Sequence, residues 1–241
     1  MVCAFISDVH SNLEALKSVF KDLKKRKISN ILFLGDAVGY GSHPNECTEI
    51  LKSECRVLIA GNHDWGVAGR TDTDFFNENA KTAIKWTKSV ISMKNIEALR
   101  SLPVKSVLKN ENITLVHSTP CEPEKWHYLI SISDAEINFQ YFDTSICYIG
   151  HSHRPFIVEK RLSGESVKYK NKVILKKNSR YIINVGSVGQ PRDGDPRASY
   201  AVSDGEKIEI ARVYYDVEAT QREIIKAGLP VQLAERLSLG M

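Results

Sequence analysis

Polar side chains that can hold a metal ion or a proton follow directly on five short apolar runs of this chain. The runs, which resemble buried strands, cover residues 2–6, 31–34, 57–60, 113–116 and 146–149. Ligands of open α/β sheets bind beyond the carboxyl ends of the strands, so we expect these side chains to converge on one rim. They are Asp8, His10, Asp36, Asn62, His63, Asp64, His117, His151 and His153.

Helices separate the strands of the N-terminal part, where the predicted strands are residues 2–7, 31–35 and 56–60. Residues 12–27 carry apolar side chains at helical spacing, with Asn12 as the N-cap. Residues 44–54 form a second predicted helix, with proline in its first turn. This alternation is typical of a parallel sheet with right-handed crossovers.

The part after residue 70 has a different pattern. It predicts helices over residues 76–93 and 94–101, then a series of short strands that we interpret as antiparallel, and closing helices near 217–227 and 230–237. Because no linker rich in Gly, Ser or Pro divides the chain, we expect one domain over residues 1–241, built on two stacked sheets. The predicted later strands are residues 104–108, 113–117, 146–150, 156–160, 173–176, 181–185, 199–203 and 208–215.

Composition limits the classes of function. The 241 residues are 42% hydrophobic, and the formal net charge is only +4, which gives little attraction to nucleic acid or an anionic membrane. The five cysteines include no C-x-x-C pair, which favours a reducing cytoplasm over a disulfide framework. The apolar run at the start is broken by Ser7 and Asp8, so neither a signal peptide nor a membrane-spanning helix is predicted.

The chemistry of the strand-end residues indicates transition-metal binding. Imidazole and carboxylate without thiolate suit Mn, Fe, Zn, Co or Ni, and the set is too large for one tetrahedral zinc. It suffices for two metals about 3.5–4 Å apart that share a carboxylate, as in phosphatases. His151 and His153 are two residues apart and would point the same way on an extended segment. A Ser-His-Asp triad is the weaker alternative, because no Gly-x-Ser-x-Gly elbow is present.

The order of the motifs resembles that of the calcineurin-like metallophosphoesterase superfamily. Residues 184–197 also resemble a stretch of its small, stand-alone prokaryotic members. The resemblance implies an α/β (α+β) fold, an αββα sandwich of two stacked mixed sheets flanked by helices. The matching motifs are Asp8-x-His10, Gly35-Asp36-x-x-Gly39, Gly61-Asn62-His63-Asp64, His117 and Gly150-His151-Ser152-His153.

The resemblance also implies a role for each motif residue. A first divalent metal, with manganese as the leading candidate, would be held by Asp8, His10, Asp36 and His153. A second would be held by Asp36, Asn62, His117 and His151, so that Asp36 bridges the two. His63 would protonate the leaving group. A hydroxide bridging the metals would attack phosphorus without a covalent enzyme intermediate.

Two positions depart from the pattern of the phosphoprotein phosphatases. Gly39 and Tyr40 stand where those enzymes carry Asp and Arg, which argues against a phosphoprotein substrate. Asp64 is the candidate for orienting His63 in place of the missing Asp. Arg192 and Arg197 lie in a loop rich in Gly and Pro, and we weigh phosphate binding and a structural turn equally there. Both are candidate substrate-binding residues.

The leading hypothesis is a cytoplasmic two-metal phosphodiesterase for a small phosphodiester or nucleotide. The alternatives are a phosphomonoesterase, a dinucleoside polyphosphate hydrolase, or a non-catalytic interaction scaffold that keeps the fold. The basic runs 21–27 and 168–177 are interpreted as a solvated helix face and a hairpin. His43 and His127 are interpreted as loop residues, although the 118–129 loop is expected near the pocket. The sequence identifies neither the substrate nor the oligomeric state.

Overall fold

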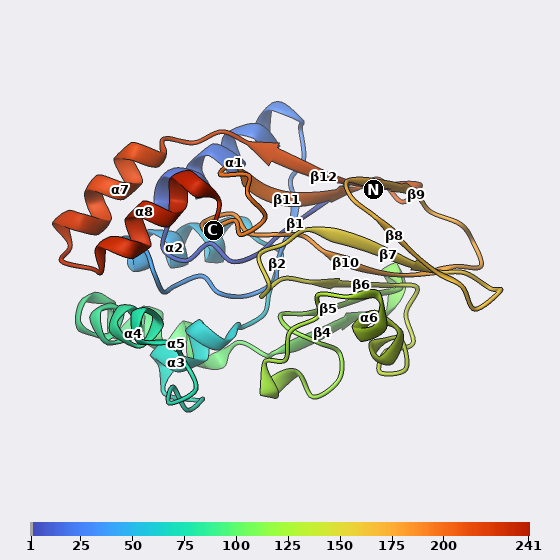
Figure 1. Cartoon of the computed structure of the whole chain (residues 1–241), viewed down its shortest axis with the longest axis horizontal. Helices are drawn as coiled ribbons and strands as arrows, with labels where there is room; N and C mark the ends of the chain where they lie inside the picture. The colour runs from blue at the N-terminus through green and yellow to red at the C-terminus, as the bar shows by residue number, and fades with distance from the viewer. Residues whose placement is uncertain (1) are drawn as a thin grey trace.

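Two six-stranded mixed sheets, stacked face to face, form the centre of the structure, a computed structural model that describes residues 2–241 (Figure 1). The first sheet has the order β3-β2-β1-β11-β12-β9 and the second β4-β5-β6-β10-β7-β8. Their strands are β1 (Cys3–Ile6), β2 (Asn30–Phe33), β3 (Val57–Leu58), β4 (Lys105–Leu108), β5 (Ile113–Val116), β6 (Ile146–Ile149), β7 (Phe156–Lys160), β8 (Ser166–Tyr169), β9 (Lys172–Ile174), β10 (Arg180–Asn184), β11 (Ala198–Ser203) and β12 (Lys207–Val213).

Helices cover the outer faces of the sandwich and one of its ends. In Figure 1, α1 lies on the outer side of the first sheet and α6 on the outer side of the second. Within residues 2–241, no helix has both the length and the apolar character needed to cross a membrane. The α-helices are α1 (Leu13–Lys25), α2 (Pro44–Glu54), α3 (Asn62–Ala68), α4 (Glu78–Val90), α5 (Met93–Ser101), α6 (Ile132–Asn138), α7 (Val217–Lys226) and α8 (Val231–Leu239).

The apolar run at the start of the chain is continuous because both faces of β1 are buried. Ala4 and Ile6 pack with the helices outside the first sheet, whereas Cys3 and Phe5 pack between the two sheets. The Phe5 ring stacks on Tyr148 of β6, with ring centroids 3.5 Å apart. Strands buried on both faces are typical of parallel sheets, and β1, β2 and β3 are parallel as the sequence predicts.

The prediction that the second half is antiparallel is wrong for three of its strands. β6 runs parallel to both β5 and β10. The reason lies in the connections, because α6 and its flanking loops separate β5 from β6 and allow a crossover where a hairpin would reverse the chain. In this sheet, β4, β7 and β8 are antiparallel to every neighbour, whereas β5 and β10 each have one parallel and one antiparallel neighbour.

The hairpin predicted over residues 168–177 is also wrong. β8 pairs with β7 in the second sheet, whereas β9 pairs with β12 in the first. The chain thus passes from one sheet to the other between Tyr169 and Lys172. The short helices α3 and α6 were not predicted, because seven residues give too little periodicity to be recognised.

The two closing helices are packing elements. Ile224 of α7 and Leu233 and Leu237 of α8 form one apolar cluster with Ala83 of α4 and the buried ring of Tyr40. Figure 1 shows α7 and α8 side by side above α4, at the end of the sandwich where β1 and β2 lead into their loops. These helices therefore support the end of the molecule that carries the strand-end residues.

We predict that Phe5→Ala lowers the free energy of unfolding by about 3–5 kcal/mol, because it leaves a cavity between the sheets. Phe75→Ala is the matched control: Phe75 is 91% exposed, so the same change there should alter stability by less than about 0.5 kcal/mol. Urea denaturation of both variants measures the difference. Equal losses would show that the contact between Phe5 and Tyr148 does not hold the sheets together.

Candidate metal centre

The predicted strand-end residues lie in tight turns at one rim of the sandwich. Asp8, His10, Asp36, His151 and His153 all have a positive φ, between 48° and 64°, which is uncommon for residues other than glycine. Such strained backbone persists where surrounding contacts enforce it, and it concentrates at functional sites. The expected extended conformation of residues 151–153 is therefore wrong.

Hydrogen bonds between the turns enforce this backbone. The Asp8 and His10 N–H groups donate to the carbonyl oxygens of Gly35 and Asp36, at 2.9 and 3.0 Å. The His151 N–H donates to Asp8 Oδ2 at 3.0 Å, which joins the rims of the two sheets. A Cβ atom at Gly150 would lie 2.5 Å from that oxygen, so the close approach requires glycine.

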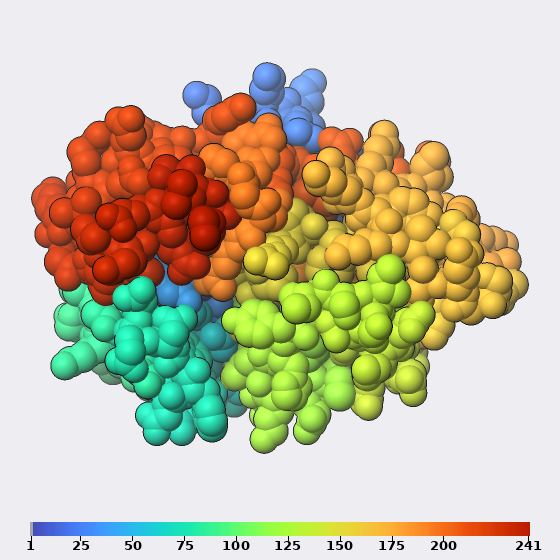
Figure 2. Space-filling model, viewed as in Figure 1, coloured from blue at the N-terminus to red at the C-terminus, as the bar shows by residue number. Residues whose placement is uncertain are grey.

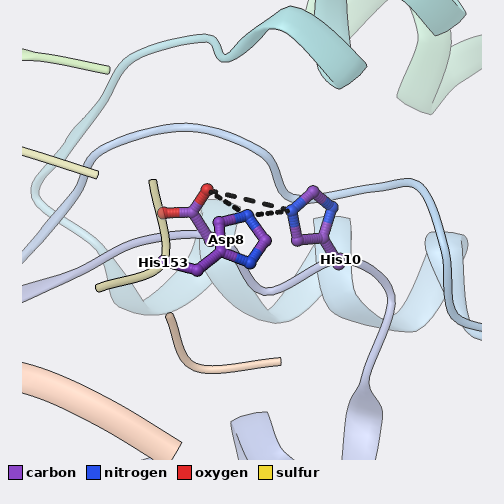
Figure 3. A group of neighbouring side chains, drawn as sticks. All are labelled: Asp8, His10 and His153. Carbon is purple, nitrogen blue, oxygen red and sulfur yellow. Dashed lines mark hydrogen bonds and ion pairs between the residues drawn. The ribbon is translucent and has the colours of Figure 1, made fainter. Parts of the chain in front are cut away.

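Three groups of donor atoms result among residues 2–241, each with its atoms within 4.8 Å of one another; two consist only of predicted ligands, and the third joins His10 and Asp36 to His63. The first contains Asp8, His10 and His153, which Figure 3 shows converging, with 3.2 Å between His153 Nε2 and Asp8 Oδ1. The second contains Asp36, His117 and His151, with 3.2 Å between His117 Nε2 and Asp36 Oδ2. Asp36 also lies 3.6 Å from His10 Nε2, so it stands between the groups.

Each of the four histidines that are predicted ligands is oriented by a main-chain carbonyl. A carbonyl oxygen only accepts hydrogen bonds, so the ring nitrogen facing it carries the hydrogen, and the other nitrogen of a neutral ring carries a lone pair. The hydrogen-bonded pairs are His10 Nδ1 with Val38 (3.1 Å), His117 Nδ1 with Leu34 (2.8 Å), His153 Nδ1 with Gln190 (2.6 Å) and His151 Nε2 with Trp126 (2.8 Å).

This arrangement fits cations between the side chains. The Nε2 atoms of His10 and His153 face each other at 3.1 Å, and in neutral rings both would present lone pairs. Asp8 Oδ1, Asn62 Oδ1 and His117 Nε2 are buried without a hydrogen-bond partner among residues 2–241. Buried acceptor atoms without donors are costly, and a divalent cation satisfies several of them at once. The donor set therefore suits metal ions.

The electrostatics of the cluster favour ionised carboxylates. Burial raises the pKa of Asp36 and Asp8, but neighbouring imidazoles outweigh burial and hold both below the usual range. Burial lowers the pKa of His117, yet the carboxylates of Asp36 and Asp8 raise it to about 9 overall. Burial lowers the pKa of His151 to about 3 and that of His63 to about 4. The carboxylates are thus negative and the His63 and His151 rings neutral, whereas His117 keeps its proton at neutral pH and would have to release it to bind a cation.

Asp64 has a different position from the one predicted. Its carboxylate accepts hydrogen bonds from the main-chain N–H groups of Asp36, Ala37, Val38 and Gly61, at 2.8–3.2 Å. It makes no hydrogen bond to His63, so the prediction that it orients this histidine is not supported by its contacts. Burial and the charge of Asp36 raise the pKa of Asp64 to about 7. Asp64 instead holds the turn that carries Asp36.

His63 is surrounded by rings. Its ring centroid lies 4.6 Å from that of Tyr40 and 5.1 Å from that of Phe76, and its Nδ1 has no hydrogen-bond partner in the described chain. A Cβ atom at Gly39 would lie 2.4 Å from that Nδ1, so the missing Asp leaves space that the His63 ring fills. The main-chain N–H of His63 donates to Asp36 Oδ1 at 2.9 Å.

A cavity of about 370 Å³ opens above the cluster and is lined by Asp36, Asn62, His63, His151 and His153. The 118–129 loop borders it, as expected, through Trp126 and Tyr128. No sequence pattern points to the Trp126 carbonyl, because any residue type supplies one. Figure 2 shows the hollow between the turquoise surface around α4 and the yellow-green surface of this loop.

The two candidate arginines are separated. Arg192 lines the cavity, and its guanidinium lies 5.7 Å from the centre of the Tyr40 ring. Arg197 is not among the lining residues and forms an ion pair with Asp195, with 2.6 Å between Nη2 and Oδ2. The alternative interpretation, a structural turn, therefore applies to Arg197. His43 and His127 lie outside the cavity lining as well.

Comparison with known proteins identifies the family. The calcineurin-like phosphoesterase superfamily domain matches residues 1–207. The chain belongs to this superfamily. An uncharacterized protein of Methanocaldococcus jannaschii is 44% identical, with 98% of this chain and 97% of that protein covered. The crystal structure of a metallophosphoesterase from Sphaerobacter thermophilus is 39% identical, with 100% and 99% coverage and a TM-score of 0.86.

The fold is shared more widely than the sequence. A hypothetical protein from Pyrococcus horikoshii is 20% identical over 100% of this chain and 98% of its own, with a TM-score of 0.82. Membership in the phosphoesterase superfamily supplies the reaction class, the metal-dependent hydrolysis of phosphoester bonds. The family model ends at residue 207, so α7 and α8, which pack against Tyr40, lie beyond the matched region.

We predict that Asp64→Asn weakens metal binding by about 10- to 100-fold, because the turn that carries Asp36 loses its acceptor. An amide has one acceptor oxygen and one donor group, so it leaves buried N–H groups unsatisfied and lowers stability by about 2–5 kcal/mol. Calorimetric titration with Mn²⁺ measures the affinity. Asp134→Asn is the control, since Asp134 also accepts main-chain N–H groups but caps the distant helix α6. Equal manganese affinities in both variants would contradict the assignment.

Proposed function

We propose that this protein hydrolyses small phosphodiesters or nucleotides with two divalent cations held in the strand-end cluster. The observation that carries the proposal is the set of buried acceptor atoms without donors, together with the facing Nε2 atoms of His10 and His153. A protein that kept only the fold as an interaction scaffold would have no need to bury these atoms beneath a cavity. Phosphomonoester and dinucleoside polyphosphate hydrolysis are the alternatives within the same chemistry.

We assign the ligands as the family pattern implies. Asp8, His10, Asp36 and His153 would hold one cation; Asp8, His10 and His153 form one donor group, and Asp36 lies with His10 in another. Asp36, Asn62, His117 and His151 would hold the other. Mn²⁺ is our leading candidate, since mixed imidazole and carboxylate sites suit it, with Fe, Zn, Ni or Co as alternatives. The bound cations would lower the pKa of a water nucleophile and neutralise charge on the phosphoryl oxygens.

The chain's own residues would position and protonate the ester. Arg192 reaches the cavity from the loop after β10 and would bind the phosphoryl group, with Tyr40 beneath its guanidinium. His63 would donate a proton to the departing oxygen. Burial lowers its pKa, and the negative phosphate beside it would favour the protonated ring again. Asp36 fixes the main chain of His63 through the hydrogen bond from its N–H group.

A small substrate fits the molecule better than a nucleic acid. The cavity of about 370 Å³ falls within the range of small-molecule sites. The net charge of +4 is low for a protein that tracks a polyanion. The basic run 21–27 lies at the end of α1 and is not part of the cavity lining.

Removing His151 should affect one cation, and removing His153 should affect the other. His151→Ala should weaken the site shared with His117, and His153→Ala the site shared with His10, each by loss of one ligand. Crystals of each variant soaked in Mn²⁺ would show by anomalous scattering which ion is lost. Loss of the same ion in both variants would refute the assignment, and full occupancy in both would refute metal binding by this pair.

The role of His63 can be separated from metal binding. His63→Ala should keep both cations and lose about 10²- to 10⁴-fold in rate on substrates that expel an alkoxide. The loss should be much smaller on p-nitrophenyl esters, whose leaving group departs without a proton. The measurement is the ratio of wild-type to variant kcat at equal metal occupancy, for alkyl esters and for the p-nitrophenyl esters bis(p-nitrophenyl) phosphate and p-nitrophenyl phosphate, a diester and a monoester. Equal losses on both kinds of leaving group would contradict proton donation by His63.

A further inference from the structure

Aromatic side chains are concentrated in the walls of the cavity above the metal cluster. Aromatic residues make up 8% of the chain, yet they are five of the seventeen residues that line this cavity. Packing inside the protein explains two of them: Tyr40 is buried beneath α8, and Phe76 packs against His63 and α4. The other three are Phe75, Trp126 and Tyr128. Of these, Trp126 is half-buried and meets the Trp65 and His117 rings edge-on, with centroids 5.6 and 6.2 Å apart, whereas Phe75 and Tyr128 are exposed.

Trp126 and Tyr128 form a wall that is tied to the metal ligands. The Trp126 carbonyl accepts from His151 Nε2, and the Tyr128 ring stacks on the His151 ring with centroids 4.3 Å apart and planes 19° apart. The Trp126 indole N–H donates to Thr71 Oγ1 at 3.2 Å, which connects this wall to the segment before α4. Tyr128 is nevertheless 56% exposed, so one side of this wall is open.

Phe75 has no packing role in the protein. Its side chain is 91% exposed, and it belongs to none of the apolar clusters or ring pairs described for residues 2–241. It stands in the segment before α4, at the rim opposite the 118–129 loop, and borders the catalytic cavity. Contact with a bound ligand would explain why a phenyl ring stands in this position.

We propose that Phe75 on one rim and Trp126 and Tyr128 on the other bind a flat aromatic ring carried by the alcohol part of the phosphoester. This inference rests on the proposed function, which places the phosphoryl group over the cluster and against Arg192. The ring is a nucleobase or an aryl group, since both present the π face on which aromatic side chains stack.

The polar residues of the same rim favour a ring with hydrogen-bonding edges. Thr71, Asp72 and Asn77 line the same cavity, and each already accepts one hydrogen bond within the protein. The Thr71 hydroxyl hydrogen, the Asn77 amide hydrogens and the second carboxylate oxygen of Asp72 can pair with the edge of a base, whereas an alkyl chain offers them no partner. A sugar without a base offers no π face and would leave Phe75 in water. The cavity volume of about 370 Å³ suits one phosphate with one ring system.

The test compares esters that expel the same kind of alkoxide with and without the ring. The first pair is adenosine 5′-monophosphate and ribose 5-phosphate, and the second is benzyl phosphate and cyclohexylmethyl phosphate. Each is supplied also as its methyl diester, so that either ester preference is covered. We expect kcat/KM to be about 5- to 100-fold higher for the aromatic member, mainly through KM. A higher kcat/KM for the aromatic member of both pairs would show that the site accepts any flat ring. A higher value in the first pair alone would show that it requires a nucleobase.

Variants at the rim identify the residues responsible. Phe75→Ala should reduce the aromatic preference at least fivefold, and Phe75→Tyr should restore it. Leu162→Ala is the control: Leu162 is 83% exposed but does not line the cavity, so the preference should stay as in the wild type. An aromatic preference that survives Phe75→Ala unchanged would overturn the proposal, as would equal kcat/KM values within both pairs.

A binding measurement separates this inference from the proposed function. The methylene phosphonate analogues of adenosine 5′-monophosphate and ribose 5-phosphate cannot lose the alcohol, and calorimetry on the manganese-loaded protein gives their Kd values. Tighter binding of the adenosine analogue without turnover of any ester would support the ring site and refute the proposed reaction. Turnover with equal Kd values for the two analogues would refute the ring site and leave the reaction standing.

Discussion

The burial of the Asp8 and Asp36 carboxylates is the constraint on which the rest of the structure depends. A buried negative charge is stable only where donors or cations surround it. Four histidine rings turn toward these carboxylates, and main-chain N–H groups of His63 and His151 reach their oxygens. The strained turns follow from the same requirement, since extended chain would carry the side chains away from the charges.

The direction of the strands explains why six separate segments can meet at one place. β1, β2 and β3 are parallel in one sheet, and β5, β6 and β10 are parallel in the other, so each sheet brings its carboxyl ends to a common rim. Asn184, at the end of β10, donates to the Gly150 carbonyl and so fixes the turn before His151. The other strands, among them β11 beside β1 in the middle of the first sheet, contribute none of the ligands that we assign.

Much of the rim could be predicted from the sequence because an apolar run that stops at Asp8 or His117 marks both a strand and its end. The contacts that complete the site could not be predicted from the sequence. The carbonyl of Trp126 is common to all residue types, and the acceptor role of Asp64 depends on a turn 28 residues away. A run of β-branched residues also does not indicate the direction of the strand relative to its neighbours, so the parallel pairing of β5 and β6 could not be predicted. In the sequence, Tyr40 is only a departure from the phosphoprotein phosphatase pattern, and nothing there indicates that its ring packs on His63.

The position of β1 has a consequence for the order in which the molecule can be completed. β1 lies between β2 and β11, and Cys3 is paired with Ser203, two hundred residues later in the chain. During synthesis this central strand therefore emerges two hundred residues before its second neighbour. Until β11 emerges, one edge of β1 lacks its partner and the first sheet is incomplete. The turn that carries Asp8, directly after β1, is likewise incomplete until residues 188 and 189 emerge, because their N–H groups donate to the Ser7 and Asp8 carbonyls.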